Sequence, residues 1–286
     1  GYVNVITVEN LHDDTIELFK SNFFIQKLKE EIGLENWYNI SKGMKISIND
    51  LILRAKELII KEDELLGLKA GRWQHKYGDV DVRIICGIGE RGKKEDGGWY
   101  IFCNDRLILA NEQTSLTGWG GEGRMVKGSP EYHGQYQLFR GFVFFESQNP
   151  SSFPWNTAKT SINPENPLYI KVKEKMISMM REVISYLNKI KKEKDGQGRR
   201  KSGPSPTELK IDNAQSLSIK DVALKTLPAA KFAAPETEKK IKQTNGQTIK
   251  YEVETDKFEI VSDHLGITDP SKIGLITFNY YLENET

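Results

Sequence analysis

The spacing of apolar and polar residues changes along the chain and predicts its secondary structure. Apolar residues recur at helical intervals over residues 21–33, where Ser21 or Asn22 is a good N-cap. A longer stripe of the same period runs through residues 168–191. Between them, residues 68–145 hold short alternating or wholly apolar runs, which are typical of strands. This order predicts an α+β fold in which helices pack on a mixed or antiparallel sheet.

Turn residues within the strand-rich region predict how its strands are connected. Gly78 and Asp79 separate two apolar runs and favour a hairpin. We expect residues 68–109 to form an antiparallel meander. A long polar loop over 110–138 and an aromatic strand over 139–145 should follow.

Both ends of the chain also carry strand-like patterns. Residues 3–8 are β-branched and apolar, and we expect them to form a strand. Because a strand needs partners, this chain is expected to be a fragment of a longer parent. Residues 249–253 alternate like a strand, and two short helices are expected at 256–265 and 271–283, which would make a small C-terminal strand-helix-helix module.

Residues 192–247 lack an apolar period and are rich in Lys, Gly, Ser, Pro, Ala and Thr. They are expected to form a flexible, disordered linker. The basic stretch 189–201 could contact nucleic-acid phosphates, although lysines are also favoured at a helix C-terminus by the helix dipole. The expected domains are residues 1–66, the strand-rich body 67–191, the linker 192–247 and the module 248–286.

Composition narrows the class of protein. The 286 residues include 41 Lys and Arg against 40 Asp and Glu, so the net charge of +1 creates no global field toward nucleic acid or membrane. No apolar run approaches the length that spans a bilayer, and we expect a cytoplasmic protein. Two cysteines cannot form a Cys-rich zinc site, and Cys86 and Cys103 are expected to be buried thiols.

Two glycine-rich stretches resemble nucleotide-binding motifs in part. Residues 87–92 match the dinucleotide pattern G-x-G-x-x-G, but charged residues and another strand follow instead of the required helix. We therefore expect a hairpin there. Residues 118–123 lack the Lys-Ser or Lys-Thr ending of a P-loop, and we expect a flexible lid or loop. The four histidines show no metal-binding spacing.

One loop combines groups that suit a phosphate contact. Lys159 lies among the amide and hydroxyl side chains of Asn156, Thr157 and Thr160. Lysine brings a point charge, and the neighbouring groups bring hydrogen-bond donors. An exposed loop lysine is more often only solvated, so both interpretations stay open at this point.

Several segments resemble, in order and spacing, the transducer domain of bacterial GHKL ATPases. This superfamily includes gyrase B, MutL and the ninety-kilodalton heat-shock chaperone, and the resemblance is greatest to prokaryotic MORC-like proteins. The segments are WYIFCNDRLIL at 99–109, TSLTGWG at 114–120, FRGFVFF at 139–145 and PWNTAKT at 154–160. Residues 6–12, 24–25 and 43–46 resemble the end of the family's ATP-binding domain and its joint to the transducer.

The resemblance implies a ribosomal-protein-like βαβ fold for the transducer and places residues 1–66 at the end of an ATP-binding domain. In this superfamily a transducer lysine contacts the ATP γ-phosphate, and Lys159 is at the matching position. Asn156, Thr157 and Thr160 would shape its loop. The family's N-box Glu and Asn, Asp-x-Gly-x-Gly stretch and glycine-rich lid do not occur in this sequence. We therefore expect ATP and Mg²⁺ to be cofactors of the full-length parent only, and this chain alone to be inactive as an ATP hydrolase, with no catalytic or metal-binding residue.

The implied function is a nucleotide-sensing part of an ATP-gated clamp, in a DNA-related or anti-phage setting. Its expected partner is the ATP-binding domain of the same parent; a homodimer and a DNA or protein client stay open, and no membrane partner is expected. The alternative is a non-enzymatic DNA- or protein-binding module that uses the basic linker and the C-terminal tail. Ribbon-helix-helix DNA binders share the order of that tail, although Tyr251, Glu252 and Val253 suit a DNA groove poorly.

Overall fold

The computed structural model describes residues 4–92, 96–120, 130–196, 203–223, 228–237 and 249–285. The chain divides into two compact units, Gly1–Lys239 and Lys240–Thr286. The helices of the first unit are α1 (Asp13–Lys20), α2 (Asn22–Glu35), α3 (Trp37–Ser41), α4 (Pro167–Gly196), α5 (Pro206–Asn213) and α6 (Ile219–Ala223), with 3-10 turns η2 (Ser115–Thr117), η3 (Gly134–Tyr136) and η4 (Pro150–Ser152). Its strands are β1 (Ser47–Ile48), β2 (Leu51–Ile52), β3 (Ile59–Lys61), β4 (Gly71–Tyr77), β5 (Val80–Ile88), β6 (Gly98–Cys103), β7 (Arg106–Glu112), β8 (Phe139–Glu146) and β9 (Ser216–Ser218).

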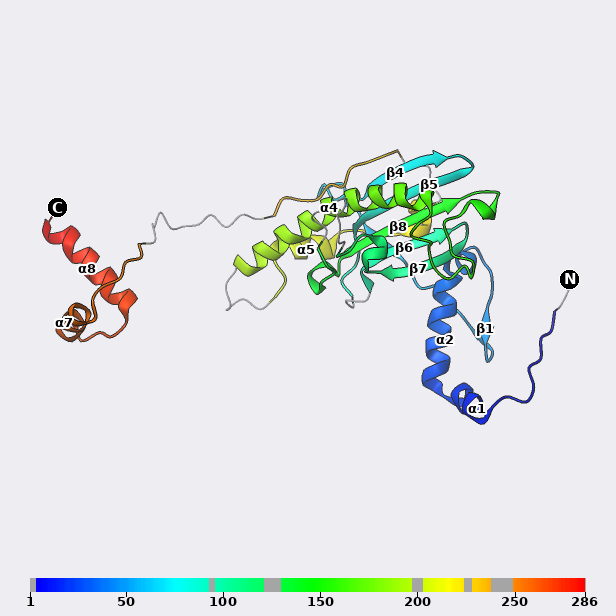
Figure 1. Ribbon diagram of the computed structural model, residues 1–286, viewed down its shortest axis with the longest axis horizontal. Coiled ribbons are helices and arrows are strands. Elements are labelled where there is room, and N and C mark those ends of the chain that lie inside the picture. The colour runs from blue at the N-terminus through cyan, green and yellow to red at the C-terminus, as the bar shows by residue number, and fades with distance from the viewer. Residues whose placement is uncertain are drawn as a thin grey trace. The chain divides into compact units, whose positions relative to one another are not determined.

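The mixed α+β architecture predicted from the sequence is confirmed, and its centre is a five-stranded sheet with the order β4-β5-β8-β6-β7 (Figure 1). Neighbouring strands are antiparallel except β6 and β8, which are parallel. The predicted hairpin at Gly78 is confirmed, and this glycine has the positive φ of 60° that its turn requires. The predicted meander is wrong, because β8 lies between β5 and β6. Every residue of β6 is buried, because β8 and β7 pair with its two edges and apolar cores cover both of its faces.

Helix α4 lies across one face of this sheet (Figure 1). Its apolar stripe packs on the inward side chains of the strands, among them Ile84, Ile101 and Val143. Met176 and Met180 are fully buried in this core, so these methionines serve packing.

A second, smaller core covers the opposite face of the sheet. Strand side chains such as Phe102 and Phe142 meet Trp37 of α3, Ile60 of β3 and Ile219 of α6. The Trp37 and Phe102 rings lie 5.6 Å apart. Helix α2 begins as predicted, with the Ser21 hydroxyl accepting a hydrogen bond from the Phe24 amide.

The prediction of a disordered linker over 192–247 is wrong for the residues that the structure describes. Helix α4 continues to Gly196, and α5, β9 and α6 then pack on the body of the first unit. Strand β9 pairs with β3, and Ala230 and Ala233 form bridges to the β4 side of the sheet. The remaining parts, 197–202, 224–227 and 238–248, lie outside the described residues. In α5 the buried residues are Thr207, Glu208 and Ile211, so two of the three are polar, and no apolar period could reveal this helix.

The strand predictions for residues 3–8 and 249–253 are wrong as well, for the described residues 4–8 and 249–253. Both are described, and neither joins a sheet. In the second unit, α7 (Thr255–Leu265) and α8 (Pro270–Glu285) match the two predicted helices. Gly266 ends α7 with a left-handed φ of 64°.

The two cysteines, Cys86 and Cys103, are buried free thiols, as expected. Burial raises the pKa of both. Among the described helices, none combines the length and apolar character needed to cross a membrane.

Candidate phosphate-contact loop and buried-arginine cavity

The predicted site residues lie between β8 and α4. After β8 the chain passes through η4, which is tied to the β4–β5 turn by Asp79. The Asp79 carboxylate accepts hydrogen bonds from the hydroxyls of Ser152, at 2.8 Å, and Ser147, at 3.1 Å. These bonds, with that from Ser152 the stronger, lower the pKa of Asp79. The start of the loop is therefore fixed to the sheet.

Asn156 organises the loop that carries Lys159. Its backbone amide donates to the Ser161 carbonyl at 2.8 Å, which closes the loop. Its side-chain oxygen accepts hydrogen bonds from the amides of Thr160, at 2.9 Å, and Ser161, at 3.2 Å. Its side-chain nitrogen donates to the Thr160 hydroxyl at 3.3 Å. One side chain thus holds three groups of the turn in place, as Asn does in Asx turns.

Lys159 lies at the exposed part of this turn. Its backbone is left-handed, with φ of 57°, and its amide donates to the Asn156 carbonyl at 2.9 Å. Its ammonium lies 4.9 Å from the centre of the Trp155 ring, a cation–π contact. Trp155 in turn meets the buried ring of Phe153. The lysine is exposed but anchored.

The four predicted residues therefore share one loop. Asn156 and Thr160 are bonded to each other, while Thr157 and Lys159 are exposed. The loop leads directly to α4, whose first amides, Leu168 and Tyr169, donate to the Asn166 side chain. Chemically, the loop offers one cation and several hydrogen-bonding groups to solvent. The sequence showed the residue types, but the hydrogen bonds that orient them could be seen only in three dimensions.

The glycine-rich stretch 87–92 does not begin a helix. Residues 87 and 88 complete β5, and the Gly89 amide donates to the Leu138 carbonyl at 2.8 Å. After the gap in the described residues, the chain enters β6. A dinucleotide site of the strand-helix kind needs a helix that begins here, and these described elements do not form one. The hairpin expected at this stretch is wrong, because β8 lies between β5 and β6.

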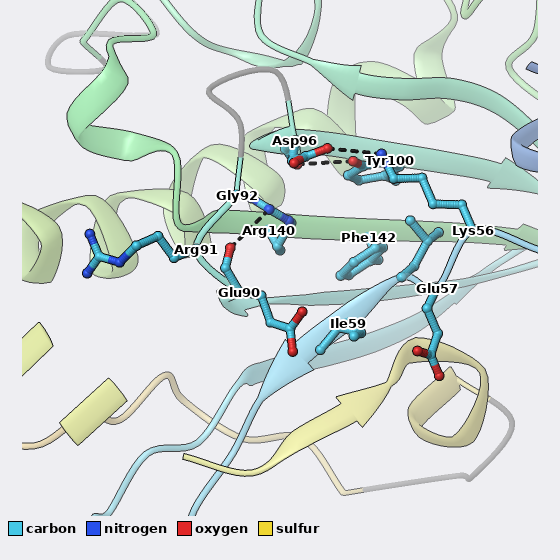
Figure 2. Close-up of a pocket in the computed structure, with 11 residues that line it drawn as sticks. Lys56, Glu57, Ile59, Glu90, Arg91, Gly92, Asp96, Tyr100, Arg140 and Phe142 are labelled. Carbon is cyan, nitrogen blue, oxygen red and sulfur yellow. Dashed lines mark hydrogen bonds and ion pairs between the residues drawn. The ribbon is translucent and has the colours of Figure 1, made fainter. Parts of the chain in front are cut away.

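The same stretch lines a cavity of about 150 Å³ that the sequence did not reveal (Figure 2). Its wall is formed in part by residues 56–59, residues 90–92, Asp96 and Tyr100. Arg140, the second residue of β8, and Phe142 complete it. Lys159 is not among the lining residues, so this cavity and the phosphate-contact loop are separate features.

Arg140 is the charged residue most deeply buried in the cavity wall, with 7 % of its surface exposed. Its guanidinium donates to the backbone carbonyls of Gln137 at 2.6 Å, Phe139 at 3.0 Å and Glu90 at 3.3 Å. Burial lowers its pKa, and Tyr100 and Asp96 oppose that effect. Burial also raises the pKa of Tyr100 to about 12.

Comparison with known proteins gives little further definition. No protein-family model matches the chain, and no curated protein matches it. Among solved structures, it is similar to the B-subunit of the DNA gyrase from Myxococcus xanthus, with a TM-score of 0.28 and 13 % sequence identity. That similarity covers 41 % of this chain and 40 % of the gyrase chain. At this level the similarity supports no conclusion about activity.

Proposed function

We propose that this chain is the nucleotide-sensing transducer part of a GHKL-type, ATP-gated protein, and that Lys159 contacts the γ-phosphate of ATP. The observation that carries the proposal is the anchored, exposed lysine in the loop between β8 and α4. The sequence resemblance of residues 99–160 supports it. ATP and Mg²⁺ would be held by an ATP-binding domain of the same parent. The cytoplasmic location, the homodimer and a DNA or protein client belong to the proposal through the resemblance alone.

Energies of the two lysine contacts favour such a switch. A charge-assisted hydrogen bond to phosphate is worth roughly 1.5–3 kcal/mol. The cation–π contact that Lys159 would give up is worth about 0.5–1 kcal/mol at an exposed site. Lys159 would therefore move to the phosphate while ATP is present and return to Trp155 after hydrolysis. Different contacts in the two nucleotide states are what a population shift requires.

The loop is suited to pass this change on to α4. Asn163 donates its amide to the Pro154 carbonyl at 2.8 Å and so closes the base of the loop. Asn166 caps α4 only three residues later. A displacement of Lys159 toward a phosphate would therefore shift the N-terminal end of α4, the helix that covers the central sheet.

The test is Lys159→Ala in a protein that carries the ATP-binding domain. Lysine and alanine both carry a Cβ atom, so the left-handed backbone is equally unfavourable for both. Only the cation–π contact is lost, and the melting temperature should fall by no more than about 4 °C. The ATPase rate or nucleotide-dependent dimerisation should fall about tenfold or more, since 1.4 kcal/mol corresponds to one decade. Lys159→Arg should restore only part of the activity, because a planar guanidinium does not reproduce a compact ammonium. Lys171→Ala, an exposed change on α4, is the matched control.

Retention of both activities within twofold in a folded Lys159→Ala protein would show that Lys159 does not contact a phosphate. Loss of activity together with loss of folding would show a structural role instead. Lys171→Ala should match the unmodified protein in both measurements.

The alternative function is a DNA- or protein-binding module. One observation favours the protein-binding version of it. Helix α8 exposes Leu275, Phe278, Tyr280, Tyr281 and Leu282. Residues 249–285 carry eight Asp and Glu against three Lys, a charge balance that disfavours DNA phosphates. The ribbon-helix-helix form of the alternative also needs a strand at 249–253, which is not formed. Fluorescence anisotropy with labelled duplex DNA tests this point, and we expect no saturable binding by residues 249–285.

A further inference from the structure

We propose that the cavity beside Arg140 is a binding site for a small tetrahedral oxyanion of the phosphate class. This proposal is independent of the function proposed for Lys159, because the two features share no residue. It rests on three observations: a buried charge without an ion pair, a glycine that makes room for it, and the size of the cavity.

The first observation is the charge of Arg140. Buried charges in proteins are normally paired with an opposite charge. Among the described residues, the partners of this guanidinium are three neutral carbonyl oxygens, and no carboxylate forms a salt bridge with it. A guanidinium has five N–H donors in a planar fork that matches oxyanion geometry. The three carbonyl bonds orient the fork and leave donors for a ligand.

The second observation explains the glycine-rich stretch. A Cβ atom at Gly89 would lie 2.4 Å from Cγ of Arg140, so only glycine lets the arginine side chain cross the strand end here. The Glu90 carbonyl, from the next residue, is one of the three guanidinium acceptors. Residues 89–90 thus hold a cation in place, whereas a dinucleotide motif would hold a pyrophosphate with its own amides.

The surrounding charges leave the guanidinium accessible to an anion. Asp96 forms an ion pair with Lys56 at 2.9 Å, and the Glu90 carboxylate accepts a hydrogen bond from Ser216 at 2.7 Å. Figure 2 shows the carboxylates of Glu57 and Glu90 directed away from the Arg140 guanidinium. Arg91, on the same rim, pairs with Glu208 at 3.2 Å and with Asp212 at 3.3 Å.

The third observation is the size of the cavity, about 150 Å³. Drug-sized and cofactor-sized ligands occupy pockets of roughly 300–1,000 Å³. The Arg140 cavity therefore suits a phosphate-sized ion, or the phosphoryl end of a larger molecule, rather than a whole nucleotide.

The direct experiment is isothermal titration of the full 286-residue chain with sodium phosphate at constant ionic strength, with sodium chloride as the blank. We expect one site per chain with a dissociation constant below about 1 mM. A parallel titration with phenyl phosphate distinguishes the source: binding of both indicates a phosphoryl group on a larger ligand, and binding of phosphate alone indicates the free ion. No saturable binding of either compound up to about ten times that concentration overturns the proposal.

Variants then locate the site. Arg140→Lys keeps the charge but loses the fork, and should weaken phosphate binding about tenfold. Arg83→Lys in the neighbouring strand β5, where Arg83 pairs with Glu146, is the matched control and should stay within twofold. Asp96→Asn removes a carboxylate from the cavity wall and releases Lys56, so it should strengthen binding several-fold.

Asp96→Asn also provides a second readout that does not depend on whether Arg140→Lys folds. If Arg140→Lys fails to fold, tighter binding by Asp96→Asn still supports the site. Unchanged or weaker binding by folded Asp96→Asn places the phosphate elsewhere and overturns the proposal. Equal weakening of phosphate binding by Arg140→Lys and Arg83→Lys would also overturn the proposal, because the effect would then not be specific to the cavity.

Discussion

At the residue scale, Gly141 shows how closely the core is packed. It lies in the interior strand β8, and an added Cβ atom would come 2.2 Å from the Trp99 ring. We expect Gly141→Ala to lower the free energy of unfolding by about 1–3 kcal/mol, because Trp99 is fully buried and cannot move aside without disturbing its neighbours. Urea unfolding followed by tryptophan fluorescence measures the change.

Gly134→Ala is the control for Gly141→Ala. No atom lies within 4 Å of a Cβ at that position. Its free energy of unfolding should stay within about 0.5 kcal/mol of that of the unmodified protein. Equal stability of the two variants would mean that Trp99 is less constrained than the packing indicates.

Sequence patterns predicted single residues where a local rule decides their role. Ser21 was one of two N-caps predicted from residue type, and the stripe over 168–191 was predicted from spacing. Arg140 was missed because its guanidinium bonds to the carbonyl of Gln137, in an irregular segment, and to that of Glu90, which is far away in sequence. The Lys159 loop was found by residue type, but its role in phosphate contact stays a prediction.

At the scale of elements, the packing of α5 and β9 depends on the buried Lys61. This residue is 5 % exposed, and its ammonium donates to the carbonyls of Asp212 at 2.8 Å and Ala214 at 3.0 Å. These carbonyls lie at the C-terminal end of α5, where the helix dipole favours a cation. One lysine of β3 thus satisfies the end of a helix that follows far along the chain.

We expect Lys61→Met to destabilise the first unit by about 2 kcal/mol, because two hydrogen bonds to a charged donor are lost in a buried site. Amide hydrogen exchange should accelerate first in α5 and β9. Lys76→Met, an exposed change on β4, should leave exchange in these elements unchanged. Uniform acceleration over the whole unit in Lys61→Met would show that α5 and β9 do not open separately.

The element predictions succeeded where local signals were strong and failed where pairing is long-range. The hairpin at Gly78 follows from turn chemistry, but the place of β8 between β5 and β6 depends on strands far apart in sequence. Wholly apolar β6 nevertheless carried a signal for an interior strand. In the expected linker, Ser205, Pro206 and Glu208 form a capping box with proline in the first turn, and this motif was the available sign of α5.

At the scale of the whole molecule, the two units differ in how much core they possess. The first unit has apolar cores on both faces of its sheet. In the described part of the second unit, Ile273 is the buried large apolar side chain, and most others on α8 are exposed. The stability of the first unit should therefore not depend on the second.

A protein that ends at Lys239 tests this independence. We expect its thermal midpoint to stay within about 2 °C of that of the whole chain, since a change of 1 kcal/mol shifts the midpoint of a domain of this size by roughly 2–4 °C. Circular dichroism melts provide the measurement. A larger fall would show that residues 240–286 stabilise the first unit.

The last prediction concerns ATP and separates the two proposed sites. The chain lacks the N-box Glu and Asn and the Asp-x-Gly-x-Gly stretch, so it should neither hydrolyse Mg-ATP nor bind it appreciably. Lys159 alone supplies one charge-assisted contact of roughly 1.5–3 kcal/mol, less than the roughly 4.1 kcal/mol that a 1 mM dissociation constant requires. Isothermal titration with Mg-ATP should therefore show no saturable heat in the micromolar range.

Micromolar binding of Mg-ATP by the isolated chain would contradict the assignment of the nucleotide site to another domain. Weak binding that Arg140→Lys abolishes and Lys159→Ala leaves intact would instead come from the phosphoryl end of ATP entering the Arg140 cavity. The two variants thus give opposite results for the two sites, because Lys159 lies outside that cavity.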